Sequence, residues 1–163
     1  ALGLAVREDA PEVAGWRLEK GERAMLRNRY LRPAPRIGLK AALRAYARAA
    51  MDVSDGLAKD LGRMCRASGC GAEVEVDAVP RSGGFARALE TQPKLVARLL
   101  AAGDDYEVLA AVPPGAGQSF QALAKRGGVD VRRIGHLCRG GDVRFVGRGG
   151  KPLQLASTGS DHD

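Results

Sequence analysis

The sequence predicts an α/β or α+β fold in which a mixed β-sheet is layered with helices. Two hydrophobic patterns favour it. Leu57, Leu61 and Cys65 recur every four residues, which places them on one face of a helix. Residues 72–77 instead alternate apolar and acidic side chains, as a half-buried strand does. The chain has 163 residues, a length that suits one domain, so helices and strands are expected to share one core.

The first part of the chain is expected to be mostly helical. Its predicted elements are a strand or entry segment at 2–6 and helices at 18–31, 37–50 and 54–67. Pro33 and Pro35 force an extended link after the first helix. The second helix is predicted from its alanine content. Ser54 is the expected N-cap of the third helix, and Gly69 is expected to end it.

Strands and helices alternate in the rest of the chain. The predicted strands are 72–77, 106–112, 129–137 and 143–146, and the predicted helices are 85–90, 93–101 and 119–126. Pro113 and Pro114 end the second of these strands, because proline lacks the N–H that a central strand donates. Gly140 and Gly141 predict that the last two strands form a hairpin.

Composition argues against several classes of protein. The chain is 45% hydrophobic and 28% charged with a net charge of +7, which is ordinary for a globular protein and argues against disorder. It contains neither a run of about 18 apolar residues nor a signal peptide, so we expect a cytoplasmic protein without a membrane span. Three cysteines without a C-x-x-C pair predict neither a disulfide framework nor a zinc site.

Positive charge is concentrated in residues 1–50, which hold 11 Lys and Arg against 5 acids. Lys40, Arg44 and Arg48 recur every four residues and predict a single basic stripe on a helix. Such a stripe is usually a solvated face. Nucleic-acid binding is not expected, because no aromatic residues are interleaved with the basic ones.

The first candidate site is the segment 52–56. The carboxylates of Asp52 and Asp55 flank a predicted helix start, with the hydroxyl of Ser54 between them. Carboxylates can hold Mg²⁺, helix N-terminal amides can receive a phosphate oxygen, and Gly56 leaves the backbone open to a ligand. A structural interpretation is simpler: Ser54 caps the helix, and Asp55 favours its positive end. The local pattern alone favours the structural interpretation.

The second candidate site is the segment 102–107, at the start of a predicted strand. Asp104, Asp105 and Glu107 supply three acids in four positions. They predict either a turn with solvated side chains or the acidic lining of a cleft. The segment alone favours the turn.

Together these segments resemble one family. Residues 51–62 read MDVSDGLAKDLG and resemble the Asp-Ile-Ser-Asp-Gly-Leu-x-x-Asp-Leu signature of thiamine-monophosphate kinase. Residues 103–109 read GDDYEVL and resemble the Gly-Glu/Asp-Asp-Tyr-Glu-Leu-Leu segment of that family. Residues 29–36 read RYLRPAPR and match its arginine- and proline-rich linker. The order and spacing agree over essentially the whole chain, so the resemblance favours the functional interpretation of both candidate sites.

The resemblance implies that residues 1–163 are the C-terminal domain of a two-domain kinase with the aminoimidazole-ribonucleotide-synthetase-like fold. An N-terminal domain, absent from this chain, would supply most metal ligands and nucleotide contacts and a homodimer interface. The implied ligands are ATP, Mg²⁺ and thiamine monophosphate. By the same resemblance, Asp52 and Asp55 would bind the metal, Ser54 and Gly56 the nucleotide, and Asp104 the thiamine substrate.

Two positions depart from the family pattern. The milder change is that the doubled glycine before the second acidic segment is reduced to Ala102-Gly103. Ser160 stands where the family often has an aromatic residue that packs on the thiamine moiety. Two alternatives therefore stay open: another ATP-dependent enzyme of the same superfamily, or a non-catalytic binding or assembly module. The isolated chain is expected to have negligible kinase activity.

Overall fold

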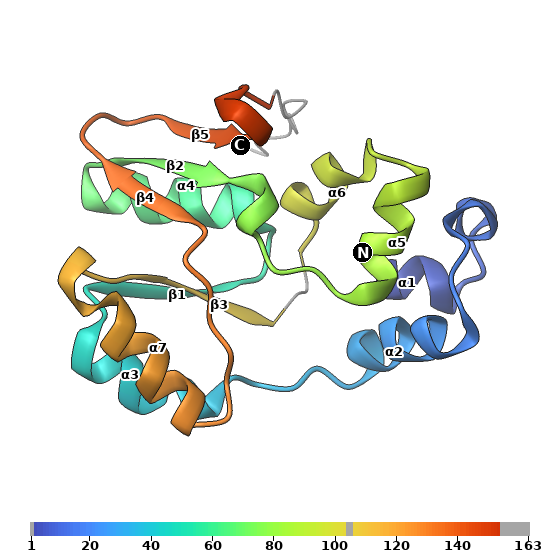
Figure 1. Ribbon diagram of the computed structural model, residues 1–163, viewed down its shortest axis with the longest axis horizontal. Helices are drawn as coiled ribbons and strands as arrows, with labels where there is room; N and C mark the ends of the chain where they lie inside the picture. The colour runs from blue at the N-terminus through green and yellow to red at the C-terminus, as the bar shows by residue number, and fades with distance from the viewer. Residues whose placement is uncertain (1, 104–105, 154–163) are drawn as a thin grey trace, which may run out of the picture.

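The computed structural model describes residues 2–103 and 106–153 (Figure 1). Its helices are α1 (Leu2–Arg7), α2 (Lys20–Leu31), α3 (Lys40–Tyr46), α4 (Leu57–Ser68), α5 (Gly83–Thr91), α6 (Leu95–Ala101) and α7 (Gly117–Arg126). Its strands are β1 (Ala49–Val53), β2 (Gly71–Glu75), β3 (Glu107–Ala111), β4 (Gly135–Cys138) and β5 (Val143–Val146). The predicted mixture of helices and sheets is confirmed.

The strands form two small sheets. β1 pairs antiparallel with β3, so that Asp52 lies opposite Val108 and Val53 lies opposite Glu107. The second sheet has the order β4-β2-β5, with β2 antiparallel to β4 and parallel to β5. The predicted hairpin of the last two strands is therefore wrong, since β2 lies between them. β2, whose residues Ala72 and Val74 are buried, is the central strand of this sheet.

Helix α4 joins the two sheets into one body. Its residues Leu57, Leu61 and Cys65 are buried, which confirms the predicted stripe, and they share a core with both β1 and β2. Helices α3 and α7 cover the other face of the β1–β3 sheet. In Figure 1 these two helices lie together below that sheet. The β1–β3 sheet thus has helices on both faces, although Ala50 and Asp52 of β1 remain exposed.

A second group of helices packs beside the sheets, around the fully buried Trp16 (Figure 1). Residues 2–6, predicted as a strand or entry segment, belong to helix α1. Leu2, Ala5 and Val6 are spaced three and four apart and pack on α2, a helical arrangement that the short run hid. The second predicted helix is also shorter than expected, because the chain leaves α3 at Tyr46 to pair as β1.

Three further expectations are wrong. Arg48 lies outside α3, where its N–H donates to the carbonyl of Ala111, so the three-residue basic stripe does not form. Ser54 is not the N-cap of α4; that position is Gly56, and no side chain caps it. Residues 129–134 form no strand before β4.

Gly69 does end α4, in the left-handed conformation that favours glycine there. Within the described ranges, none of the helices is long and apolar enough to cross a membrane.

Candidate functional site

A pocket of about 270 Å³ lies where three segments of the chain meet. These segments are the linker after α2, the end of β1 and the start of β3. Its lining residues are Pro35, Arg36, Asp52, Val53, Ser54, Tyr106, Glu107 and Val108. The pairing of β1 with β3 explains the arrangement, because it places the last residues of one strand beside the first residues of the other.

The two segments predicted to form a site lie against each other. A Cβ on Gly103 would lie 2.0 Å from the carbonyl oxygen of Ser54, and one on Gly56 would lie 2.6 Å from the carbonyl oxygen of Ala101. Gly56 also has φ of 104°, which other residues rarely adopt. Glycine is therefore required at both positions by close backbone packing. The predicted substrate residue Asp104 follows directly after Gly103 but lies outside the described residues.

The predicted metal and nucleotide residues differ in their surroundings. Asp52 and Ser54 are exposed and line the pocket. Asp55 does not line it, and its half-exposed carboxylate forms an ion pair with Arg63 of α4. This hydrogen bond with Asp55 raises the pKa of the Arg63 guanidinium. Gly56 is buried beneath residues 101–102, so its place in the structure is explained by packing.

The segment 52–55 contains carboxylates, which are the type of ligand that a hard divalent cation binds. At the pocket, Asp52 presents a carboxylate of the type that such a cation binds, whereas the carboxylate of Asp55 is paired with Arg63. Among the described residues, no group of three or more His, Cys, Asp or Glu side chains could hold a metal ion. Of the two predicted metal ligands, only Asp52 lines the pocket.

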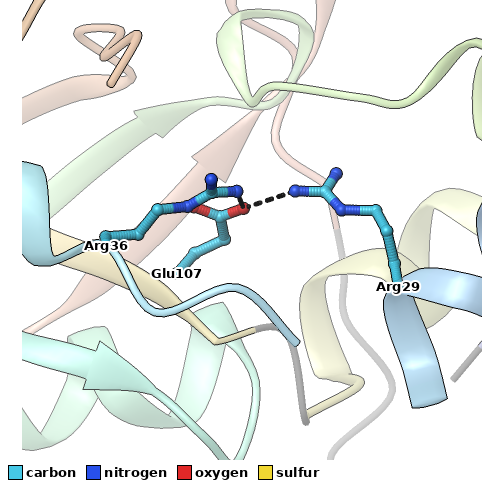
Figure 2. Close-up of polar contacts among 3 residues, drawn as sticks. All are labelled: Arg29, Arg36 and Glu107. Carbon is cyan, nitrogen blue, oxygen red and sulfur yellow. Dashed lines mark hydrogen bonds and ion pairs between the residues drawn. The ribbon is translucent and has the colours of Figure 1, made fainter. Parts of the chain in front are cut away.

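Glu107 is held by two arginines from other parts of the chain (Figure 2). Arg36 of the linker donates from Nε and Nη2 to the two carboxylate oxygens, with Nε at 2.9 Å from Oε2. Arg29 of α2 donates from Nη2 to Oε1 at 3.0 Å. The hydrogen bonds to Glu107 raise the pKa of Arg36. Because both oxygens accept from guanidinium groups, Glu107 connects α2 and the linker to β3.

Sequence reasoning gave no role to Asp60 or Arg63, and it included Arg29 and Arg36 only as part of the linker motif. Glu107 belonged to the acidic cleft lining that was one interpretation of its segment, and it does line the pocket. Asp60 is fully buried and accepts hydrogen bonds from the backbone of the loop between β1 and α4. One signal was visible: an acidic residue stands next to Leu61 on the apolar face of α4. A charge at such a position needs partners, and these are Arg63 on the same helix and two backbone amides before the helix.

Comparison with known proteins places the chain in a family. Residues 4–148 match the family described as AIR synthase related protein, C-terminal domain. The chain belongs to this family. It is 41% identical to the thiamine-monophosphate kinase of Caulobacter vibrioides over 137 residues, which cover 81% of this chain and 39% of that protein.

Two solved structures extend the likeness within this AIR synthase related family. The crystal structure of thiamine-monophosphate kinase from Stenotrophomonas maltophilia is 31% identical with a TM-score of 0.72, covering 87% of this chain and 48% of that one. The structure of AaThiL complexed with AMPPCP and TMP is 27% identical with a TM-score of 0.67, covering 83% of this chain and 42% of that one. The chain thus spans less than half the length of the relatives it matches.

Proposed function

We propose that residues 1–163 are the C-terminal domain of a two-domain kinase that transfers the γ-phosphoryl group of ATP to thiamine monophosphate. The observation that carries this proposal is the pocket at the end of β1. Asp52 and Ser54 line this pocket, and the Asp-Val-Ser-Asp-Gly segment packs against residues 101–103, in a chain similar to thiamine-monophosphate kinases along most of its length. The related AaThiL structure contains an ATP analogue together with TMP, which supports both substrates.

In this proposal each candidate residue has one role. Asp52 and Asp55 hold Mg²⁺, which supplies charge neutralisation to the phosphates when it is bound. Ser54 contacts the nucleotide, the buried Gly56 allows the loop beside Ser54 to pack closely on residues 101–102, and Asp104 contacts the thiamine substrate. Asp52 and Ser54 support these roles best, because both side chains are exposed at the pocket. Asp55 reaches a cation only after it exchanges its ion pair with Arg63.

The reaction asks mainly for positioning and charge stabilisation. A phosphate oxygen of thiamine monophosphate attacks the γ-phosphorus, a new P–O–P bond forms, and ADP leaves. The acceptor phosphate is already ionised near pH 7, so no general base is needed to activate it. The described lining of the pocket, which contains no histidine, suits such a reaction. Arg36 adds a positive charge beside the pocket, where anionic substrates would approach.

The rest of the site belongs to the longer polypeptide. The N-terminal domain would contribute the remaining metal ligands and nucleotide contacts and a homodimer interface, and the enzyme would act in the cytoplasm. The separate 163-residue chain would then have negligible kinase activity. The tail at 159–163, where Ser160 replaces an aromatic residue of the family, lies outside the described residues.

The direct test is a product assay on the complete polypeptide that contains this chain. Purified protein with Mg²⁺ and ATP is expected to convert thiamine monophosphate to thiamine diphosphate. Thiamine monophosphate is then set in competition with phosphorylated intermediates of purine synthesis. Turnover of a purine intermediate instead would favour the other enzymes of the superfamily, and absence of Mg²⁺-dependent nucleotide binding would favour a non-catalytic module.

A further inference from the structure

Asp60 is a buried charge on helix α4. Among the charged side chains that the structure describes, the side chain of Asp60 is the one that is fully buried. Transfer of a carboxylate from water into a protein core is unfavourable unless hydrogen bonds and opposite charges replace its hydration. The groups that compensate Asp60 therefore show what this residue holds in place.

Three donors surround the carboxylate, and two of them are backbone amides. Oδ2 accepts from the N–H of Ser54 and from the N–H of Asp55, each at 2.9 Å. Oδ1 accepts from Nη1 of Arg63 at 2.9 Å. A side-chain donor can rotate away from its acceptor, whereas consecutive backbone amides cannot do so without a change in the path of the chain. The carboxylate therefore fixes the direction of the loop at residues 54 and 55.

The hydrogen bonds of a helix or a strand do not hold this loop in place. Ser54 and Asp55 belong neither to β1 nor to α4, and both are exposed. The backbone of residues 101–103 also packs on the same loop, with no room for a side chain at Gly56 or Gly103. The loop thus contacts both the carboxylate of Asp60 and this second segment of backbone.

Asp60 itself does not line the pocket, so it cannot contact a ligand there. We propose that Asp60 is a positioning residue, which acts through the backbone amides of Ser54 and Asp55 and fixes the side chains of these two residues for the nucleotide and the metal. Arg63 extends the same network, because it pairs with both Asp60 and Asp55 and connects the buried charge to the exposed one. This inference rests on the proposed function for the roles of Ser54 and Asp55.

The test compares Asp60→Asn with Met64→Val in the complete polypeptide. Asparagine has the shape of aspartate, but it has one acceptor oxygen, so its NH₂ group faces either the two amides or Arg63. Met64 is buried in the core on the same helix and does not line the pocket, so Met64→Val serves as a control for lost core packing. Kinetics are measured well below the melting temperature of both variants, together with residue-resolved hydrogen exchange.

For Asp60→Asn we expect amide exchange at residues 54 and 55 to accelerate at least tenfold, and kcat to fall at least tenfold. The KM for Mg-ATP should rise about fivefold, with less than a twofold change in the KM for thiamine monophosphate. A smaller folded fraction would lower the maximal rate without a change in KM, so the KM separates positioning from simple destabilisation. Met64→Val should leave both KM values unchanged.

An unchanged exchange rate at residues 54 and 55, or an unchanged KM for Mg-ATP, would overturn the proposal. If Asp60→Asn does not fold, Asp60→Glu takes its place with the same readouts, since it keeps the charge but displaces the carboxylate by one methylene group. If the wild-type polypeptide does not phosphorylate thiamine monophosphate, the proposed function fails. The exchange rates would still show whether Asp60 holds the loop.

Discussion

Asp60 and Glu107 each accept three hydrogen bonds beside the candidate site, but from very different donors. Asp60 is fully buried, and two of its donors are backbone amides of the loop that it supports. The side chain of Glu107 is 44% exposed, and its donors are two long arginine side chains. Arg29 and Arg36 must lose conformational freedom to form their bonds, and water competes with them for the carboxylate.

The comparison indicates two kinds of support for one pocket. Asp60 fixes the shape of a loop within the body formed by α4 and the sheets, so its contribution is local and insensitive to salt. Glu107 connects parts of the chain that are far apart in sequence, α2 and its linker on one side and β3 on the other. We therefore expect the buried carboxylate to dominate stability and the exposed one to have a smaller, salt-dependent effect.

The largest effect on stability is expected from Asp60→Ala. The two part-buried amides lose their charged acceptor, and a hydrogen bond to a charged group contributes about 1.5–3 kcal/mol, so the free energy of unfolding should fall by about 3 kcal/mol. Urea denaturation measures this, with Lys59→Ala on the exposed face of α4 as the matched control. A loss no larger than that of the control would show that the buried charge does not stabilise the loop.

The next effect concerns chemistry more than stability. Asp55→Asn in the complete polypeptide should lower kcat about 100-fold, because one proposed metal ligand is removed. The free energy of unfolding should change by less than about 1 kcal/mol, since Asp55 and Arg63 form a half-exposed pair. Activity and urea denaturation are measured on the same preparation. Unchanged turnover, or a loss of activity explained by lost stability alone, would favour a purely structural role for Asp55.

A pH effect is expected at the other end of α4. Burial, and secondarily the neighbouring thiol of Cys70, raise the pKa of Cys65 to about 11. The unfolded chain therefore loses the thiol proton of Cys65 at lower pH than the folded chain does. The protonated thiol contributes fully to the free energy of unfolding below about pH 9, and this contribution is lost as the pH rises toward 11. The loss is on the order of 2 kcal/mol. Denaturation curves of wild type and Cys65→Ala between pH 8 and 11 test it, because parallel curves would contradict a raised pKa.

The smallest effects belong to the exposed cluster around Glu107. Glu107→Gln should lower the free energy of unfolding by about 1 kcal/mol, and Arg29→Met by about 0.5 kcal/mol or less. Both differences should shrink in 1 M NaCl, where the Debye length is about 3 Å. Equal losses at low and high salt would mean that packing, rather than charge, connects the linker to β3.

Patterns among neighbouring residues predicted the elements that are determined mainly by interactions within the element itself. The stripe on α4 and its end at Gly69 follow from helical spacing and from the left-handed conformation of glycine, and both are present. The extent of β1 could not be predicted in the same way, since Ala49 and Ala50 favour a helix by intrinsic propensity. They are a strand because they pair with Ala111 and Ala110, which lie about 60 positions away in the sequence.

The sequence predicted the two segments of the site, but not the contacts that hold these segments in place. Asp52, Ser54 and Asp55 stood out by residue type, and their segment does lie against residues 101–103. Sequence spacing could not show that Asp60 accepts hydrogen bonds from residues before the helix, or that Arg36 reaches Glu107 across 71 positions. Both contacts depend on the folded path of the chain, and both explain why the pocket has its shape.

The account depends most on the claim that Asp52 and Asp55 bind a divalent cation beside this pocket. The most direct measurement is a crystal structure of the complete polypeptide with Mn²⁺ and a non-hydrolysable ATP analogue, in which anomalous scattering locates the metal. We predict Mn²⁺ within coordination distance of both carboxylates, with Arg63 displaced from Asp55. Metal and nucleotide bound elsewhere, with the pair between Asp55 and Arg63 intact, would contradict the claim.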